Sequence, residues 1–241
     1  MNYILRNLIL STQYCTRTNM MDKKIELLTP KNCALLMIDY QPQMAFGVVS
    51  IDRQALKNNA VALAKSAKLF HVPTILTSVE TESFSGFIWP ELLDVFPKND
   101  IIERTSMNSW DSEQVRQQIK NTGKKKLILA GLWTEVCINM CAFSAMQDGY
   151  ELYVVEDACG GTSVTAHQSS MNRMQQAGVV PVCWQQVLLE WQRDWARKET
   201  YDGVMNIVKE HSGAYGMGVD YAYTLVHKQP SRSEWNGKTV K

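Results

Sequence analysis

The feature that most constrains the fold is a regular alternation of short apolar runs with longer stretches of helical periodicity. Between the runs, segments such as 52–70 place apolar side chains three and four positions apart, which is typical of a helix. Strands that alternate with helices form βαβ units, so we expect a mostly parallel six-stranded sheet with helices on both faces. The predicted strands are 33–40, 72–79, 100–104, 125–131, 151–158 and 179–184.

These elements define one domain over residues 31–200. We expect residues 1–30 to be an N-terminal extension. The run "YILRNLILS" is interrupted by Arg6 and Asn7, and no small-residue cleavage site follows it, so a signal peptide is not predicted. Residues 201–241 are predicted to be a C-terminal extension that supplies oligomer contacts and ends in a loose polar tail.

Charge and cysteine content exclude several classes of function. The chain has 25 basic and 24 acidic residues, a balance that disfavours nucleic acid or an anionic membrane as the main partner. No apolar run approaches the ~20 residues of a membrane span. The six cysteines form no CxxC pair and show no zinc spacing. We therefore expect reduced thiols, a cytoplasmic location and no metal.

The phosphate-binding loops of nucleotide enzymes are missing from this chain. The first predicted strand is followed by "IDYQPQMAFG" rather than GxGxxG, and no GxxxxGK[ST] motif occurs. No cofactor is therefore predicted. In open α/β sheets ligands bind at the carboxyl ends of the strands, so the chemistry is expected there.

Three polar side chains fall at those strand ends. Asp39 closes the first strand, Arg104 closes the third, and Cys137 lies in the first turn after the fourth. A helix start and a neighbouring cation would favour a thiolate at Cys137, and Asp39 could move its proton. Each residue also has a purely structural interpretation: Asp39 as a cap, Arg104 as an ordinary ion-pair residue, Cys137 as a small core side chain.

Several segments resemble the isochorismatase-like cysteine hydrolases, and most closely the YcaC-like group. The resemblance covers roughly residues 31–200 and is carried by "LLMIDYQ", "IIERTSMNSWDS", "GLWTEVC", "DGYELYVVEDA" and "RMQQAGVVPVCWQQVLLEWQRDW". It implies a three-layer α/β/α, Rossmann-like sandwich and an Asp-Lys-Cys triad, matched here by Asp39 and Cys137. The lysine position falls on Arg104, which keeps the charge but cannot carry a proton.

The resemblance also implies how the site is built. A non-prolyl cis peptide is expected just before "TEVC", at Trp133–Thr134, directing backbone N–H groups of Trp133, Thr134 and Cys137 toward an oxyanion. Metal-binding relatives use Asp and His, but His71 has no histidine neighbour in the sequence, which agrees with the absence of a metal. The predicted pocket residues are Phe46, Phe84, Trp89 and Trp133, each of which is also compatible with a place in the core.

Together these features predict a cysteine hydrolase of small amides or other C–N compounds that works through a thioester. The alternative is a catalytically weak relative that binds a small molecule or responds to oxidation through Cys137 and Cys141. A homo-oligomer is expected, because the apolar surface of "VLLEWQRDWA" and "YDGVMNIV" exceeds what one sheet end can cover. The resemblance to the YcaC-like group implies a large assembly, such as an octamer.

Overall fold

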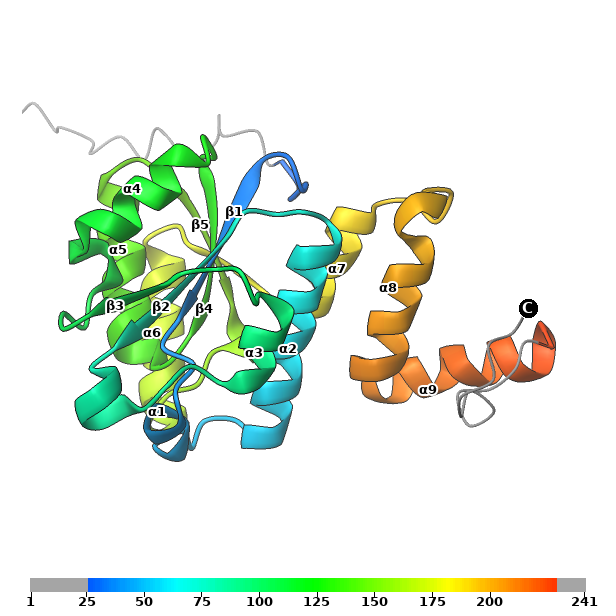
Figure 1. Cartoon of the computed structure of the whole chain (residues 1–241), viewed down its shortest axis with the longest axis horizontal. Coiled ribbons are helices and arrows are strands. Elements are labelled where there is room, and N and C mark those ends of the chain that lie inside the picture. The colour runs from blue at the N-terminus through cyan, green and yellow to red at the C-terminus, as the bar shows by residue number, and fades with distance from the viewer. Residues whose placement is uncertain (1–25, 229–241) are drawn as a thin grey trace, which may run out of the picture.

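The computed structural model describes residues 26–228, and within them six parallel strands form one sheet in the order β3-β2-β1-β4-β5-β6 (Figure 1). All but the last five residues of the expected N-terminal extension therefore lie outside the described residues. The strands match the predicted runs closely, since fully buried parallel strands require continuous apolar sequence. They are β1 (Cys33–Ile38), β2 (Thr74–Val79), β3 (Ile101–Arg104), β4 (Lys126–Gly131), β5 (Glu151–Val155) and β6 (Val180–Val182).

Helices cover both faces of the sheet, which confirms the three-layer α/β/α architecture (Figure 1). One layer contains α2 (Arg53–Leu69), α3 (Pro90–Val95) and α7 (Trp184–Gln192). The opposite layer contains α4 (Glu113–Asn121), α5 (Asn139–Gln147) and α6 (Val164–Gln176). The short helix α1 (Pro42–Phe46) follows β1 at the carboxyl edge of the sheet.

Two helices are preceded by turns of a different helical type. Ser109–Asp111 form a separate 3₁₀ turn before α4, and the Ser112 hydroxyl caps α4 by accepting from the backbone N–H of Val115. The helix after β4 begins with a π-helical turn, Thr134–Ile138, and becomes α-helical only from Asn139. We call residues Thr134–Ile138 the cysteine turn, because Cys137 lies within it.

The C-terminal segments are packed differently from the expectation. The apolar side chains of α7, together with those of α8 (Lys198–His211), are buried against α2, including Trp191, Val204 and Val208 at 0% exposure. The apolar surface assigned to oligomer contacts is therefore already covered within one chain. The expected domain boundary at residue 200 falls inside α8.

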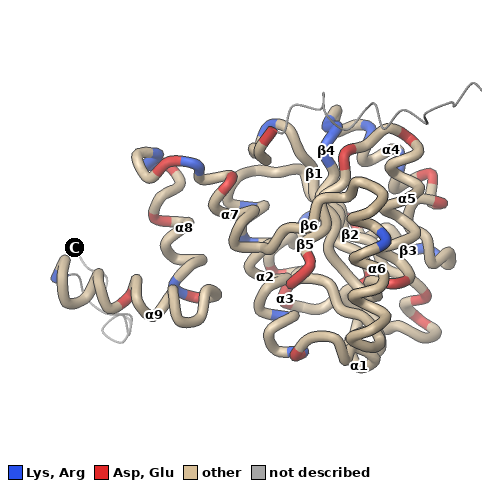
Figure 2. Tube along the Cα trace, turned by 180° about the vertical axis from the view of Figure 1, so that it is seen from behind, with Lys and Arg blue, Asp and Glu red and all other residues tan. Residues whose placement is uncertain are grey.

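Beyond α8, the chain continues into α9 (Gly213–Tyr221) and a π-helical turn, Ala222–Val226, which project away from the sheet (Figure 1). We call residues 213–226 the arm. Figure 2 shows α9 almost free of charged residues. The exposed apolar side chains of the arm are Tyr215, Met217, Tyr221, Leu225 and Val226. None of the helices in residues 26–228 is long and apolar enough to cross a membrane.

Candidate active site

The candidate site lies where the strand order reverses, between β1 and β4. Asp39 follows β1, and the cysteine turn begins three residues after β4 ends. The two strands approach closely at Gly131, where an added Cβ would lie 2.0 Å from the carbonyl oxygen of Ile38. Gly131 also has a φ of 154°, so glycine is required there on two grounds. Such a reversal opens the crevice in which α/β proteins bind ligands.

Arg104 reaches this crevice from β3 by crossing over β2. Its Nε donates to the hydroxyl of Thr77 on β2 at 3.0 Å. Its Nη2 donates to both carboxylate oxygens of Asp39, at 2.6 and 2.5 Å, and Nη1 donates to the carbonyl oxygen of Ser106. The guanidinium therefore has a fixed orientation, and the predicted meeting of Asp39 with Arg104 is present in the structure.

Asp39 is fully buried, and burial is the main reason why its pKa is raised to about 6. The charge of Arg104 opposes that rise, as does a hydrogen bond from the Cys137 thiol. At neutral pH the carboxyl group is thus mostly ionised, although its pKa lies close enough to 7 for proton transfer in both directions. That is the range in which a carboxyl group serves as a general base and then as an acid.

Cys137 does not have the lowered pKa that the sequence suggested. Cys137 is 2% exposed, and burial raises the pKa of its thiol. The Asp39 carboxylate adds to that rise. The charge of Arg104 and a backbone hydrogen bond from Trp133 act in the opposite direction but are smaller. The expectation failed because it considered the helix start and the cation without desolvation. Burial and the Asp39 carboxylate thus favour the neutral thiol at Cys137.

Two backbone predictions require correction. The cis peptide joins Leu132 to Trp133, one bond earlier than expected. Leu132 still pairs with the sheet, donating to the carbonyl oxygen of Ile38 at 3.0 Å, so the chain leaves the strand only after it. The N–H of Thr134 is not directed at an oxyanion, because it donates to the carbonyl oxygen of Gly160 at 3.0 Å. The backbone N–H groups of Trp133 and Cys137 remain candidates for binding the oxyanion.

The predicted pocket residues all lie on segments that follow the carboxyl ends of strands, but their environments differ. Phe46 and Phe84 are 70% and 57% exposed. Trp89 is buried, with its ring centroid 5.0 Å from that of Tyr40. Trp133 is half-buried over α1, and its indole N–H donates to the carbonyl oxygen of Met44 at 2.7 Å. With Cys137 and Asp39 buried, the site is closed to solvent in this conformation.

The remaining site candidates lie apart from this chemistry. Cys141 is fully buried one turn along the helix from Cys137, and burial raises its pKa to about 12. His71 is exposed just after α2. Lys98, the nearest upstream lysine, is exposed before β3, so Arg104 is the cation that reaches Asp39. Among residues 26–228, no group of three or more His, Cys, Asp or Glu side chains could hold a metal ion.

Sequence reasoning missed the side chains that hold the three predicted residues in place. Thr77 and Ser106 anchor Arg104 from different segments, a relationship that no local pattern reveals. His167 and Ser170 bind the cysteine turn from α6. Their spacing of three residues places them on one face of a helix, and that spacing was the available signal.

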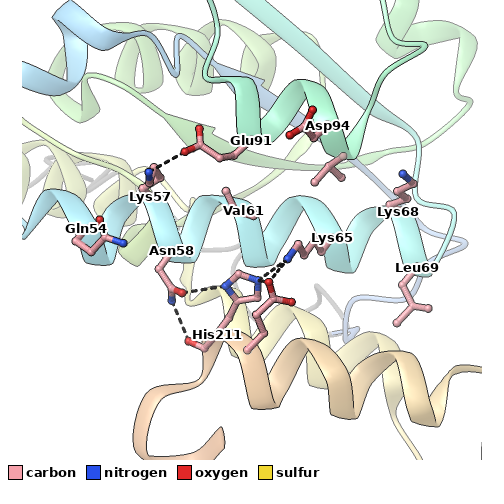
Figure 3. A pocket seen from close by; sticks show the side chains of 12 residues that line it. Gln54, Lys57, Asn58, Val61, Lys65, Lys68, Leu69, Glu91, Asp94 and His211 are labelled. Atoms are coloured by element: carbon pink, nitrogen blue, oxygen red, sulfur yellow. Dashed lines mark hydrogen bonds and ion pairs between the residues drawn. The ribbon is translucent and has the colours of Figure 1, made fainter. Parts of the chain in front are cut away.

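A groove of about 710 Å³ lies away from Cys137, between α2, α3 and α8. Figure 3 shows its polar walls, where Lys57 pairs with Glu91 and Lys65 contacts His211. Its opposite charges largely pair with each other, so it offers no concentration of unpaired charge. None of Asp39, Arg104 and Cys137 lines this groove.

A parallel sheet with this strand order brings an aspartate, a cation and a cysteine together at the point where the order reverses. The isochorismatase domain model matches residues 33–186, and the chain belongs to the isochorismatase family, which places it among hydrolases.

Two similar proteins, both with solved structures, make this placement specific. The probable hydrolase YcaC of Escherichia coli is 36% identical over 196 residues, covering 81% of this chain and 93% of that protein. Its crystal structure, described as an octameric hydrolase of unknown specificity, matches with a TM-score of 0.80 over 85% of this chain and 99% of that one. YcaC from Pseudomonas aeruginosa, with hexane-2,5-diol and covalent acrylamide, matches with a TM-score of 0.79 at 33% identity, covering 82% and 98%.

Proposed function

We propose that this chain is a cysteine hydrolase of small amides or other C–N compounds. The observation that carries the proposal is the arrangement at the strand reversal: the Cys137 thiol donates to Asp39, whose carboxylate is held by Arg104. A buried thiol beside a carboxyl group with a pKa of about 6 is equipped for nucleophilic attack with proton transfer.

In the proposed reaction, Asp39 takes the thiol proton as the Cys137 sulfur attacks the carbonyl carbon of the substrate. The oxyanion accepts hydrogen bonds from the backbone N–H groups of Trp133 and Cys137. The C–N bond then breaks, and the departing amine takes the proton from Asp39. Water, deprotonated by Asp39, attacks the resulting thioester, which releases the acid and restores the thiol.

Arg104 acts in this scheme by electrostatics alone. Its bonds to Asp39 keep the carboxyl group ionised despite burial, and its charge lowers the cost of forming the Cys137 thiolate. Neither task needs a proton from the guanidinium, so arginine can stand where the family usually has lysine. The alternative, a catalytically weak relative that binds small molecules, remains the outcome if no amide is hydrolysed.

The covalent acrylamide in the Pseudomonas aeruginosa relative is consistent with a reactive nucleophile. Acrylamide is an electrophile that adds to thiolates, and it also carries a small primary amide. The apolar residues around the carboxyl ends of the strands favour a small, weakly charged substrate here as well.

A panel of small aliphatic and aromatic primary amides tests the proposal through ammonia release, with Cys137→Ala as the blank. We expect turnover by the natural chain, none by the variant, and an acyl adduct on Cys137 in rapidly quenched samples. Turnover that persists in Cys137→Ala would rule out the thioester route.

We further propose that the chain is a homo-oligomer and that the arm contacts a second copy. The arm has one charged residue, Asp220, while Met217 is 74% exposed and Leu225 is 58% exposed. A helix with this composition is normally buried. The octameric description of the Escherichia coli relative makes another copy of the chain the natural cover.

Light scattering tests the role of the arm. The natural chain should have a mass several times 27.4 kDa, and Met217→Glu combined with Leu225→Glu should yield smaller species. Val180→Glu, at an exposed apolar residue on β6, is the control. A monomeric natural chain, or equal effects of the arm and control changes, would contradict the proposal.

A further inference from the structure

Helix α6 binds the cysteine turn through one face. His167, Ser170 and Arg173 lie three residues apart, so their side chains point in similar directions. The Ser170 hydroxyl donates to the carbonyl oxygen of Thr134 at 3.0 Å, and it accepts from Asn139 at 2.9 Å. Arg173 in turn donates to the side-chain oxygen of Asn139 at 3.2 Å.

Thr134, at the start of the cysteine turn, is fully buried and has each of its polar groups engaged. Its N–H donates to Gly160, its carbonyl accepts from Ser170, and its hydroxyl lies 2.8 Å from Nδ1 of His167. Cys137 follows three residues later, within the same helical turn. A displacement of Thr134 therefore moves the thiol relative to Asp39.

The direction of the His167 hydrogen bond follows from its other neighbour. Nε2 of His167 lies 3.7 Å from a carboxylate oxygen of Glu156, which can only accept. The tautomer with its proton on Nε2, which faces Glu156, leaves Nδ1 to accept from the Thr134 hydroxyl. Burial lowers the pKa of His167, whereas Glu156 and Glu135 oppose this, so the neutral ring that can accept is the prevailing form at pH 7.

The His167 side chain is 12% exposed and borders a cavity. His167 lines a cavity of about 500 Å³, together with Ser50, Asp157, Cys183 and others. A side chain of similar size without a hydrogen-bond acceptor could turn into that space. The orientation of the ring thus depends on its polar contacts with Thr134 and Glu156.

We propose that His167 is a positioning residue, which anchors Thr134 so that the cysteine turn keeps the Cys137 thiol buried and directed at Asp39. The inference rests on the proposed function for its effect on turnover, but its effect on the exposure of Cys137 is independent of any substrate. It assigns to α6 a role in the reaction that the three predicted residues did not include.

Two substitutions separate hydrogen bonding from packing. His167→Leu keeps the bulk but removes the acceptor, whereas His167→Asn places an amide oxygen near the position of Nδ1. Asn172→Ala, on the exposed side of α6, is the matched control. Thermal unfolding of each variant shows whether it is folded, and iodoacetamide labelling with peptide mapping measures the reactivity of Cys137.

We expect His167→Leu to label faster at Cys137 than the natural chain, because a loosened turn exposes the thiol. Its kcat should fall by roughly 10- to 100-fold with KM nearly unchanged, since small misplacements of reacting groups cost this much. His167→Asn should recover most of both properties. Faster labelling combined with slower turnover is a result that general destabilisation of substrate binding would not produce.

Unchanged labelling in a folded His167→Leu variant would overturn the proposal, as would equal behaviour of the Asn and Leu variants. If Cys137→Ala hydrolyses the same amide, the thioester mechanism fails, but the labelling comparison still decides whether His167 holds the turn. The two failures are therefore distinguishable.

Discussion

Nη2 of Arg104 lies 2.6 Å from one carboxylate oxygen of Asp39 and 2.5 Å from the other, and both side chains are buried. The contact joins strands β3 and β1, which are separated in the sheet by β2. Arg104 therefore contributes charge to a site that its own strand does not border. Whether the site works as a hydrolase depends on this pair, on the nearby thiol and on the turn that presents it.

The fall of kcat/KM at low pH should reflect the protonation of Asp39. Asp39 must be ionised to accept the thiol proton, so kcat/KM should fall about tenfold per pH unit below its pKa of about 6. Asp39→Asn should be slower by roughly 10²–10⁴-fold. Measuring kcat/KM from pH 4.5 to 8 checks both. If Asp39→Asn keeps some activity and its kcat/KM falls at low pH as in the natural chain, the titrating group is not Asp39.

Arg104→Ala should destabilise the fold in a pH-dependent way. It leaves the Asp39 carboxylate buried without its cation, which typically costs about 3–5 kcal/mol. The pKa of Asp39 should rise further above about 6, and the folded state then binds that proton more tightly. The loss should therefore be largest above the raised pKa and should shrink as the pH falls through it. Denaturant unfolding at several pH values measures this.

Arg104→Lys separates two views of the arginine. If Arg104 acts through its charge, lysine should keep much of the activity, although it loses the contacts with Thr77 and Ser106. If arginine has weakened an ancestral enzyme, lysine should raise activity well above that of the natural chain. Comparing kcat/KM of the two proteins on one amide decides between these outcomes.

Cys183 should react with iodoacetamide faster than Cys137 does at pH 7 in the absence of substrate. Cys183 is partly exposed, whereas Cys137 is 2% exposed and its pKa is raised by burial and by Asp39. The labelling rate of Cys137 should continue to rise above pH 8. Peptide mapping over time follows both thiols, and a plateau for Cys137 near neutral pH would show that it is a thiolate at rest.

Gly131→Ala should destabilise the chain more than Gly149→Ala. Both glycines have positive φ, at 154° and 83°, but only at Gly131 would the added Cβ meet another atom, the carbonyl oxygen of Ile38. Backbone strain costs roughly 1–3 kcal/mol, and the clash adds to it at Gly131. Equal losses in denaturant unfolding would show that β1 and β4 separate without cost at this point.

The sequence by itself determined the sheet and the polar residues that stand at the carboxyl ends of its strands. Continuous apolar runs bounded by turn residues specify buried parallel strands, so all six were found within a few residues of their bounds. Because the carboxyl ends of such strands meet at one edge, Asp39, Arg104 and Cys137 could be placed in one crevice without coordinates.

Only the tertiary structure decided how those groups behave. Burial of Cys137 beside a carboxylate outweighs the helix start and the cation, which reverses the direction expected for its pKa. The partners of Arg104 and of Thr134 come from strands and helices far away in the chain. Desolvation and long-range hydrogen bonds depend on which segments meet, and local patterns of residues carry no record of that.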